Sequence, residues 1–469
     1  MTIDCDVVVI GAGLSGLVAA DALTRVGLDV AVIEAADRVG GRTLSHAGDH
    51  GDSIDLGASF VCDEQVEICA LIDRLGLRRT PSPEQGRHIS HIGDRDRFWR
   101  GGVPLLTPRQ VIDVARIVHR FDTLAADPDV QCPPRTPAAA RLDELSVGRW
   151  LTRYQASATA KELVRTAIRL IFASELQEIS LLHFLFCLRS AGGFRSYIRT
   201  RGREQQRISG GAQRICELLA ANLPRAPRLG HRIDRIEQHD DHIVAQGPAC
   251  AVRARRVVLA VPPVAVARIA FNPRLPMLTQ MLYERVRPGS VVKLNLTYPH
   301  AFWRASGLSG KYSALGGPLS IAMDVSAPND APAQLMAAAV ANSARSLRDR
   351  TPAEIEATVI GELARVFGPA ARTPLRVHWH DWHDDIAAGG YAGVFAPGVW
   401  STFGQGYRKP WRRVHFAGTE TAQRFYGAME GAVSAGQRVA AEVRGRQRSY
   451  DADHEPAYVL PGLWHPDIL

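Results

Sequence analysis

The chain has 469 residues, which is enough for two or three lobes and a large buried core. With 46% hydrophobic and 22% charged residues, the composition excludes a disordered or fibrous chain. The net charge of +8 comes from arginines that are spread along the chain among acidic residues. Since no basic block with interleaved aromatics occurs, we expect no nucleic-acid partner.

Cysteine usage predicts a reducing, cytoplasmic setting. The number is odd, the spacing is scattered and no CxxC pair occurs, which argues against both a disulfide framework and a metal site. The positions are Cys5, Cys62, Cys69, Cys132, Cys187, Cys216 and Cys250. A first strand starting at about Asp6 would leave no room for a signal peptide. No run of roughly 18 apolar residues occurs, so we expect no membrane span.

The chain opens with a unit of strand, glycine turn, helix and strand. Val7–Ile10 is a short β-branched run typical of a buried strand, and Gly11–Gly16 follows it with glycines at the first, third and sixth positions. A helical stretch then runs to Gly27, and the second strand, Val30–Ile33, ends at Glu34. This combination is typical of nucleotide-binding proteins.

Each part of this unit has a physical role in binding a dinucleotide. Gly11 permits the tight turn, Gly13 lets the backbone approach a pyrophosphate, and Gly16 allows close packing of helix on strand. The helix start, with Leu14 and Ser15, offers free N–H groups to phosphate, and Glu34 can bind ribose hydroxyls.

A second loop extends the predicted nucleotide site. Residues 37–42 read Asp-Arg-Val-Gly-Gly-Arg, which combines close backbone approach with positive charge against phosphate. Residues 55–60, Asp-Leu-Gly-Ala-Ser-Phe, come soon after. A nicotinamide dehydrogenase requires no such second loop, so the pattern favours a different dinucleotide.

The middle of the chain mixes predicted helices and strands. We expect helices at 157–172, 180–188 and 209–219, hairpin strands at 231–238 and 243–246, and a buried strand at 256–261 that prolines end. Residues 290–296 alternate as a strand, with Lys293 on the face opposite Val292 and Leu294. A lysine in such a strand either lies at a sheet edge or has a function, because its burial is costly.

The carboxy-terminal part carries two more motifs. Trp382 lies seven residues before the pair Gly389-Gly390, and Tyr391 follows the pair; both aromatics could be plain core residues. The strand at 415–417 turns at Gly418, and a helix with one apolar face opens after Gly427. The start of this helix can direct free N–H groups at the ring of a bound redox cofactor, on which negative charge collects when it is reduced.

Together these motifs resemble the flavin-dependent monoamine oxidase and L-amino acid oxidase family, over about residues 5–445. The resemblance implies an α/β fold in which an FAD-binding domain of the glutathione-reductase type, with a Rossmann-like parallel sheet, is interleaved with an α+β substrate-binding domain. The FAD-binding domain would comprise 1–79, 206–265 and 385–445, and the substrate-binding domain 80–205 and 266–384. The tail, 446–469, would lack the membrane anchor found in some relatives.

The resemblance also implies roles for individual residues. Lys293 would hold a water against flavin N5, Trp382 would lie against the flavin, and Tyr391 would form one wall of an aromatic substrate cage. The implied cofactor-binding residues are Gly11, Gly13, Leu14, Ser15, Gly16, Glu34, Ala35, Arg38, Gly41, Arg42, Gly57, Ala58, Ser59, Ile233, Trp382, Gly418, Glu420, Ala428 and Met429.

Three departures from the family pattern bear on cofactor and substrate. Tyr391 stands where the membrane enzymes have a cysteine that attaches FAD, so we expect non-covalent FAD. Ala428 stands where the family has the second cage tyrosine, which leaves room for a bulkier substrate. Glu204 appears in place of a cavity glutamine; it either lines the cavity and binds a second cationic group or is a solvated loop residue.

The expected reaction is oxidation of an amine at the C–H next to nitrogen, with hydride passing to flavin N5, an imine product, and O₂ reduced to H₂O₂. Alternatives are an L-amino acid oxidase, with Arg87, Arg195 or Arg199 as candidate carboxylate ligands, and a flavin dehydrogenase or desaturase on a cyclic intermediate. A flavin-binding protein without turnover is a further alternative. The partners would be a small amine and O₂, and the enzyme could form a homodimer.

Overall fold

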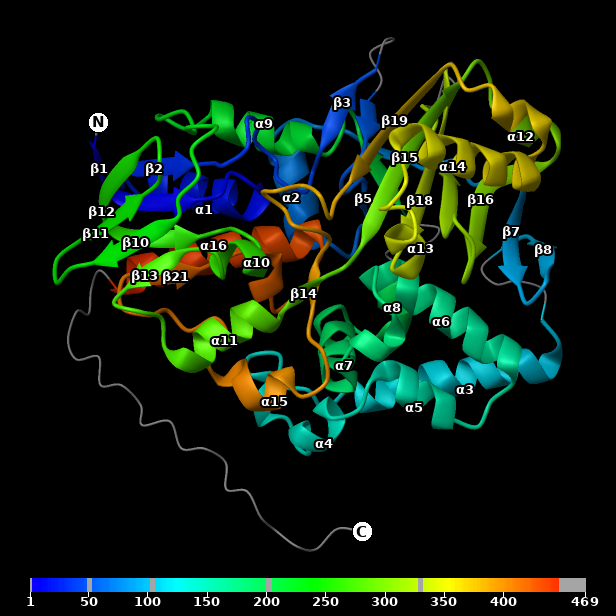
Figure 1. Ribbon diagram of the computed structural model, residues 1–469, viewed down its shortest axis with the longest axis horizontal. Helices are drawn as coiled ribbons and strands as arrows, with labels where there is room; N and C mark the ends of the chain where they lie inside the picture. The colour runs from blue at the N-terminus through cyan, green and yellow to red at the C-terminus, as the bar shows by residue number, and fades with distance from the viewer. Residues whose placement is uncertain (1, 49–52, 102–105, 200–204, 328–331, 447–469) are drawn as a thin grey trace, which may run out of the picture.

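The computed structural model describes residues 2–48, 53–101, 106–199, 205–327 and 332–446. Two seven-stranded sheets and a layer of helices make up most of this structure (Figure 1). The first sheet is built from strands near both ends and the middle of the chain, so the chain leaves it and returns to it twice. The predicted α/β class with a parallel sheet is confirmed.

The parallel part of the first sheet is organised around β1 (Thr2–Ile10). β1 pairs in parallel with β2 (Val30–Ile33) on one side and with β12 (Ala251–Leu259) on the other, and β21 (Val414–Phe416) continues in parallel with β12. The antiparallel extension is made by β11 (Ile243–Gln246) and β10 (Arg235–Gln238), with β13 (Ala270–Asn272) parallel to β10 at the edge.

Helices α1 (Leu14–Thr24) and α16 (Met429–Arg446) pack together against this sheet, although they come from opposite ends of the chain. Gly436 of α16 makes this approach possible, because a Cβ there would lie 2.5 Å from the Ser15 carbonyl oxygen. The same core contains α2 (Val66–Arg74) and α9 (Gln213–Ala221).

In the second sheet the strand order is β19-β15-β18-β17-β16-β7-β8. The bounds are β19 Arg376–Asp381, β15 Val291–Tyr298, β18 Ala333–Val340, β17 Ile321–Asp324, β16 Leu308–Ala314, β7 Arg87–Ile92 and β8 Arg95–Trp99. One face packs Val292 and Leu294 against α14 (Pro352–Phe367) and its neighbours. The alternate residues, Lys293 among them, face the other way, as the sequence predicted. Because β15 lies between β19 and β18, the edge-strand interpretation of Lys293 is wrong.

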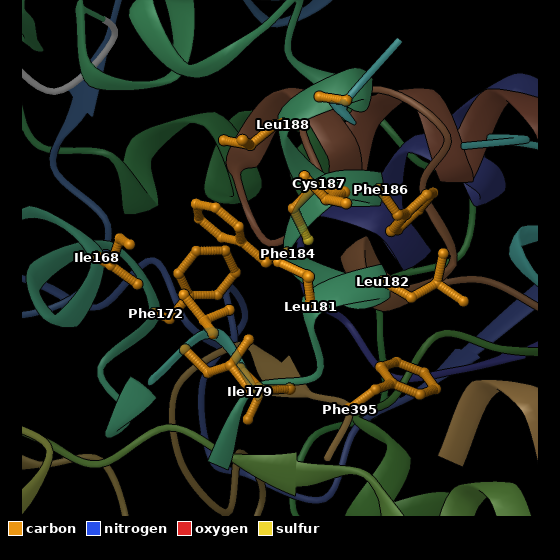
Figure 2. Packing of buried hydrophobic residues seen from close by; sticks show 14 of the residues in the cluster. Ile168, Phe172, Ile179, Leu181, Leu182, Phe184, Phe186, Cys187, Leu188 and Phe395 are labelled. Carbon is orange, nitrogen blue, oxygen red and sulfur yellow. The ribbon is translucent and has the colours of Figure 1, made fainter. Parts of the chain in front are cut away.

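A third layer consists of helices (Figure 1). Its main members are α3 (Pro108–Leu124), α5 (Val147–Arg153), α6 (Ala158–Phe172), α7 (Leu181–Ser190) and α8 (Phe194–Arg199). Figure 2 shows the Phe184 ring of α7 beside the Phe172 ring of α6, and Phe395 joins the same core from a distant segment. Every residue of α7 except Arg189 is buried, which explains its apolar sequence.

Shorter elements connect these layers. They are β3 Ser45–Ala47, β4 Ser53–Asp55, β5 Phe60–Val61, β6 Arg79–Pro81, β9 Gln206–Ile208, α4 Ala139–Asp143, α10 Pro263–Val266, α11 Met277–Arg285, β14 Arg287–Pro288, α12 Phe302–Ala305, α13 Asn342–Arg345, β20 Gly393–Val394 and α15 Val399–Phe403.

The predicted helices at 157–172 and 180–188 are confirmed as α6 and α7, whereas the first strand begins earlier than predicted, at Thr2. Two segments lie across the proposed domain boundaries. β13 belongs to the first sheet although it follows residue 265, and α15 packs with the helical layer although it follows residue 385. The division into domains therefore remains a proposal.

Candidate active site

One cavity of about 1180 Å³ extends between the first sheet, the second sheet and the helical layer. The carboxyl ends of the parallel strands converge on it: Gly11 follows β1, Glu34 follows β2, Ala260 follows β12 and Gly418 follows shortly after β21. Ligands of open α/β sheets bind at this edge.

The glycine turn has no space for side chains at Gly11 and Gly16, but it leaves free space for a ligand at Gly13. Gly11 has a φ of +103°, and a Cβ there would lie 2.7 Å from the Ala260 carbonyl oxygen. A Cβ on Gly16 would lie 2.0 Å from the Gly11 oxygen, so Gly16 is required for helix-on-strand packing. A Cβ on Gly13 would meet only the Gly40 oxygen, at 4.0 Å, and would project into free space. The free space at Gly13 fits the pyrophosphate of a dinucleotide.

Glu34 lies at the same edge, buried, with its carboxylate tied to the backbone. Its two oxygens accept hydrogen bonds from the Ala12 N–H at 2.6 Å and the Ala36 N–H at 2.9 Å. Burial raises the pKa of Glu34, against the lowering effect of these backbone hydrogen bonds. The carboxylate is therefore fixed in direction, and its remaining lone pairs can accept ribose hydroxyls.

The second glycine loop is braced by two arginines. Arg38 donates to the Gly41 carbonyl oxygen at 2.9 Å and lies 3.7 Å from the Asp385 carboxylate. Arg42 makes a bidentate pair with Glu420, with N···O distances of 2.6 and 2.8 Å. Burial would raise the pKa of Glu420, but the charge and hydrogen bonds of Arg42 outweigh this effect and hold the pKa below its usual range.

Lys293 is buried in the cavity wall, with 8% of its surface exposed. Its ammonium donates to the Gly57 carbonyl oxygen at 2.7 Å and to Ser59 Oγ at 2.6 Å. Burial lowers the pKa of Lys293 to about 8, against a smaller opposing effect of Asp55. Since an ammonium carries three N–H donors, one remains for a water or ligand in the cavity.

Trp382 and Tyr391 reach the cavity from the segment after β19. The Trp382 indole N–H donates to the Leu56 carbonyl oxygen at 2.9 Å, which fixes the ring beside the 56–59 segment. Tyr391 packs in the same small core as Trp382, and its backbone N–H donates to the Gly289 oxygen at 2.9 Å. The start of α16 closes this side of the cavity with Ala428 and Met429.

Nearly all the residues singled out from the sequence meet at this cavity. Those that line it are Gly11, Gly13, Leu14, Ser15, Glu34, Ala35, Arg38, Gly41, Arg42, Gly57, Ala58, Ser59, Ile233, Lys293, Trp382, Tyr391, Gly418, Ala428 and Met429. Gly16 and Glu420 do not line it; Gly16 lies under the turn and Glu420 contacts the cavity through Arg42. Glu204 lies outside the described residues.

Sequence reasoning missed the apolar end of the cavity. α6 contributes Leu170 and Ile171, the second sheet contributes Met323 and Met336, and Phe425 comes from the turn before α16. Gln205, next to Glu204, is a buried polar residue in the lining. The period-two spacing of Met336, Ala338 and Val340 could have marked the strand face, but nothing local identifies the α6 residues as cavity lining.

The cavity has a glycine-lined dinucleotide site at the carboxyl ends of the parallel strands, and this site continues into an apolar chamber lined by the buried Lys293. This combination defines a dinucleotide-dependent oxidoreductase. Residues 14–444 match the family described as flavin containing amine oxidoreductase. The chain belongs to this family; it is a flavin-containing enzyme that oxidises amines.

Individual relatives agree with this assignment. A Mycobacterium tuberculosis protein named as a flavin-containing monoamine oxidase (AofH) is 34% identical over 440 residues, 93% of this chain and 96% of that protein. Human flavin-containing amine oxidase B is 32% identical over 450 residues, 94% of this chain and 86% of its own length. Both relatives therefore match along nearly the whole of this chain.

Solved structures of amine oxidases have the same fold. Cyclohexylamine oxidase from Brevibacterium oxydans has 31% identity and a TM-score of 0.89, and a putrescine oxidase bound to putrescine has 29% identity and a TM-score of 0.89. Each covers 95% of this chain and 100% of its own. Within the described residues, no helix is long and apolar enough to cross a membrane.

Proposed function

We propose that the chain binds FAD non-covalently and oxidises a neutral amine to an imine, with O₂ as the final electron acceptor. The observation that carries this proposal is that Lys293, Trp382 and Tyr391 line the same cavity as the glycine cradle. The cradle at Gly13 and Gly41 takes the pyrophosphate, and Glu34 takes a ribose. Tyr391, in place of a cysteine, leaves no thiol for covalent attachment after Gly390.

Gly13, Gly41 and Glu34 would hold FAD, which when bound would supply the redox chemistry as acceptor of the hydride from the carbon next to nitrogen, with O₂ as final electron acceptor and H₂O₂ as product. In the substrate a C–H bond breaks and a C=N bond forms as the nitrogen loses its proton. Tyr391 and Trp382 offer aromatic surface rather than a carboxylate to the amine, which favours its neutral form in a desolvated site. The Lys293 ammonium donates to Gly57 and Ser59, and with its remaining donor it would hold a water or an anionic oxygen in the cavity.

An L-amino acid oxidase is the second candidate, and it requires a cation for the substrate carboxylate. Arg87 does not serve, because it is exposed and lies over the Phe98 ring at 5.1 Å, outside the cavity lining. The side chains of Arg195 and Arg199 lie outside the described part of the chain. Lys293 is the cation at the apolar end of the described lining, and its ammonium already donates to Gly57 and Ser59. The amine is therefore the better-supported substrate.

The test is anaerobic mixing of the yellow protein with amines and L-amino acids while the visible flavin band is followed. Bleaching by an amine that air reverses with H₂O₂ formation supports the proposal. Bleaching that air does not reverse indicates a dehydrogenase with another acceptor, and bleaching by amino acids alone contradicts the amine assignment. A fully loaded protein that no compound bleaches would favour a binding role without turnover.

We further propose a cytoplasmic location, which is supported by the seven cysteines of the described residues, none of which forms a disulfide. We also propose a homodimer, to be tested by sedimentation of the purified holoenzyme.

A further inference from the structure

We propose that a single buried water molecule binds beside the Arg42–Glu420 pair and is held by the hydroxyl groups of Tyr283 and Tyr407. These two tyrosines and Glu420 line a second cavity of about 10 Å³, next to the large one. This volume admits about one water molecule and no larger ligand. The inference does not depend on the identity of the substrate or on the reaction.

The second cavity lies where three parts of the fold meet. Tyr283 comes from α11, Tyr407 from the segment after α15, and Glu420 from the segment after β21. The other side chains of the lining are apolar apart from Thr421, whose hydroxyl already donates to the Gly418 carbonyl oxygen at 2.8 Å. The side chains that can still bind a polar ligand are therefore the two tyrosines and Glu420.

The rings of both tyrosines occupy sites that would suit phenylalanine. Tyr283 stacks on Phe416 with 5.2 Å between the ring centroids, and Tyr407 packs edge-on against Trp400 at 4.9 Å. Neither hydroxyl oxygen is exposed to solvent, and neither has a hydrogen-bond partner within the described part of the chain. Because a buried hydroxyl without any partner is costly, a cavity bordered by two such hydroxyls is a site for a polar ligand.

The nearest cation does not satisfy the Tyr407 hydroxyl. The guanidinium carbon of Arg408 lies 4.7 Å from the Tyr407 ring centroid. Burial raises the pKa of this hydroxyl, and the charge of Arg408 opposes that effect. No Arg408 nitrogen reaches hydrogen-bond geometry with the hydroxyl, since the two terminal nitrogens donate to the carbonyl oxygens of Val130 at 2.7 Å and Ala422 at 2.8 Å.

Glu420 supplies the third partner of the water. Its Oε1 accepts from Arg42 at 2.6 Å and from the Gly393 N–H at 3.3 Å, whereas its Oε2 accepts from Arg42 at 2.8 Å. Since each carboxylate oxygen can accept two hydrogen bonds, Oε2 can take one more. Burial raises the pKa of both tyrosine hydroxyls, and the nearby negative charge of Glu420 adds to this effect. The water then makes three hydrogen bonds, the usual number for a buried water.

A crystal structure of the wild-type holoenzyme, at a resolution that shows ordered waters, tests the site directly. We expect a density peak at about 2.5–3.0 Å from both hydroxyl oxygens. In the double variant Tyr283→Phe/Tyr407→Phe the peak should be absent. Hydroxyls that bond directly to each other or to a protein carbonyl, a cavity without a peak, or a peak that refines as an ion heavier than water would each overturn the inference.

A thermodynamic cycle on the holoenzyme tests whether the two tyrosines share one ligand. Tyr283→Phe and Tyr407→Phe should each lower Tm by about 1–3 °C. The double variant should lose about as much as the larger single loss, because the same water is lost in each case. The control cycle pairs Tyr407→Phe with Tyr298→Phe, whose hydroxyl donates to the Ala371 carbonyl oxygen at 3.0 Å in the core of the second sheet. The losses in that cycle should add.

The opposite results are equally specific. A hydroxyl that binds nothing is removed at no cost, so an unchanged or higher Tm in both single variants would contradict the proposal. Additive losses for Tyr283→Phe and Tyr407→Phe would show that the two hydroxyls bind separate partners, and would also overturn it. If a variant does not fold, the density in the wild type decides. None of these results bears on amine oxidation, which flavin bleaching tests.

Discussion

Arg42 and Glu420 form a bidentate ion pair across a separation of 378 residues, with N···O distances of 2.6 and 2.8 Å. The pair joins the second glycine loop to the segment after β21, so it closes the cofactor site from two ends of the chain. Glu420 also accepts the Gly393 N–H at 3.3 Å, which links the pair to the segment of Tyr391.

Breaking this pair should weaken both the fold and cofactor retention. Glu420→Gln leaves the largely buried Arg42 without its counter-charge, so we expect a loss of about 2–4 kcal/mol in unfolding free energy and faster flavin release. Because the folded pKa of Glu420 is lowered, its contribution is present above the unfolded pKa and disappears as pH falls through the folded value. Thermal melts over a pH series should show the largest difference from wild type at pH 7, and this difference should shrink as the pH falls through the lowered folded pKa of Glu420. The exposed pair Arg214–Glu217 is the control, and Glu217→Gln should change little.

Replacement of Lys293 by methionine should separate the two halves of the reaction. Anaerobic bleaching by amine should continue, whereas reoxidation by O₂ should slow by about 10²-fold, because the ammonium that stabilises developing negative charge on oxygen is gone. The pKa of Lys293 is about 8, so in the wild type the O₂ step should fall as pH rises through this value. Stopped-flow reoxidation from pH 6 to pH 10 measures this, and an inflection near 8 that persists in the variant would contradict the assignment.

Amine oxidation itself should show the opposite pH dependence. Since the aromatic lining receives a neutral amine, kcat/KM should rise with pH until the free substrate is deprotonated and then level off. The midpoint should follow the pKa of the amine when benzylamine is compared with a less basic ring-substituted analogue. If kcat/KM does not change with pH, or if its midpoint does not follow the pKa of the amine, then the protonated amine reacts.

Gly13→Ala should produce a folded but colourless protein. The added Cβ would meet the protein only at 4.0 Å, at the Gly40 oxygen, but it would occupy the space that the pyrophosphate needs. We expect thermal stability of the flavin-free form close to wild type and FAD affinity reduced roughly tenfold or more. The control is Gly361→Ala in α14, where a Cβ meets nothing within 4 Å and helix propensity should add about 0.5–1 kcal/mol. If FAD affinity is unchanged in Gly13→Ala, the pyrophosphate does not bind at this turn.

The part of the cavity that we assign to the cofactor could be predicted from sequence motifs, because its requirements are local. The turn at Gly11–Gly16 and the strands on either side are encoded by adjacent residues, and they appear in the structure, with the first strand beginning earlier than predicted, at Thr2. Lys293 was ambiguous by itself, since only the pairing of β15 on both sides shows that it is interior.

The substrate end depends on contacts that no local pattern reveals. Leu170 and Ile171 lie on a helix whose other residues form a core, and the packing of layers decides which of them face the cavity. The left-handed backbone of Phe425 is imposed by Ser190, which is distant in the chain. The sequence therefore predicted Ala428 in the cavity wall but gave no sign that Phe425 also lines the cavity.

The contact of α1 with α16, where Gly436 meets the Ser15 carbonyl, has a consequence for biosynthesis. The glycine turn before α1 leaves the ribosome first, and α16 is made several hundred residues later. At typical elongation rates the roughly 400 intervening residues take about 20–80 s to synthesise. During that time the nascent chain has the glycine turn but lacks α16, which packs against α1 in the finished fold. Flavin capture should therefore follow the synthesis of α16, and yellow colour should report that a chain has been made and folded at least through this helix.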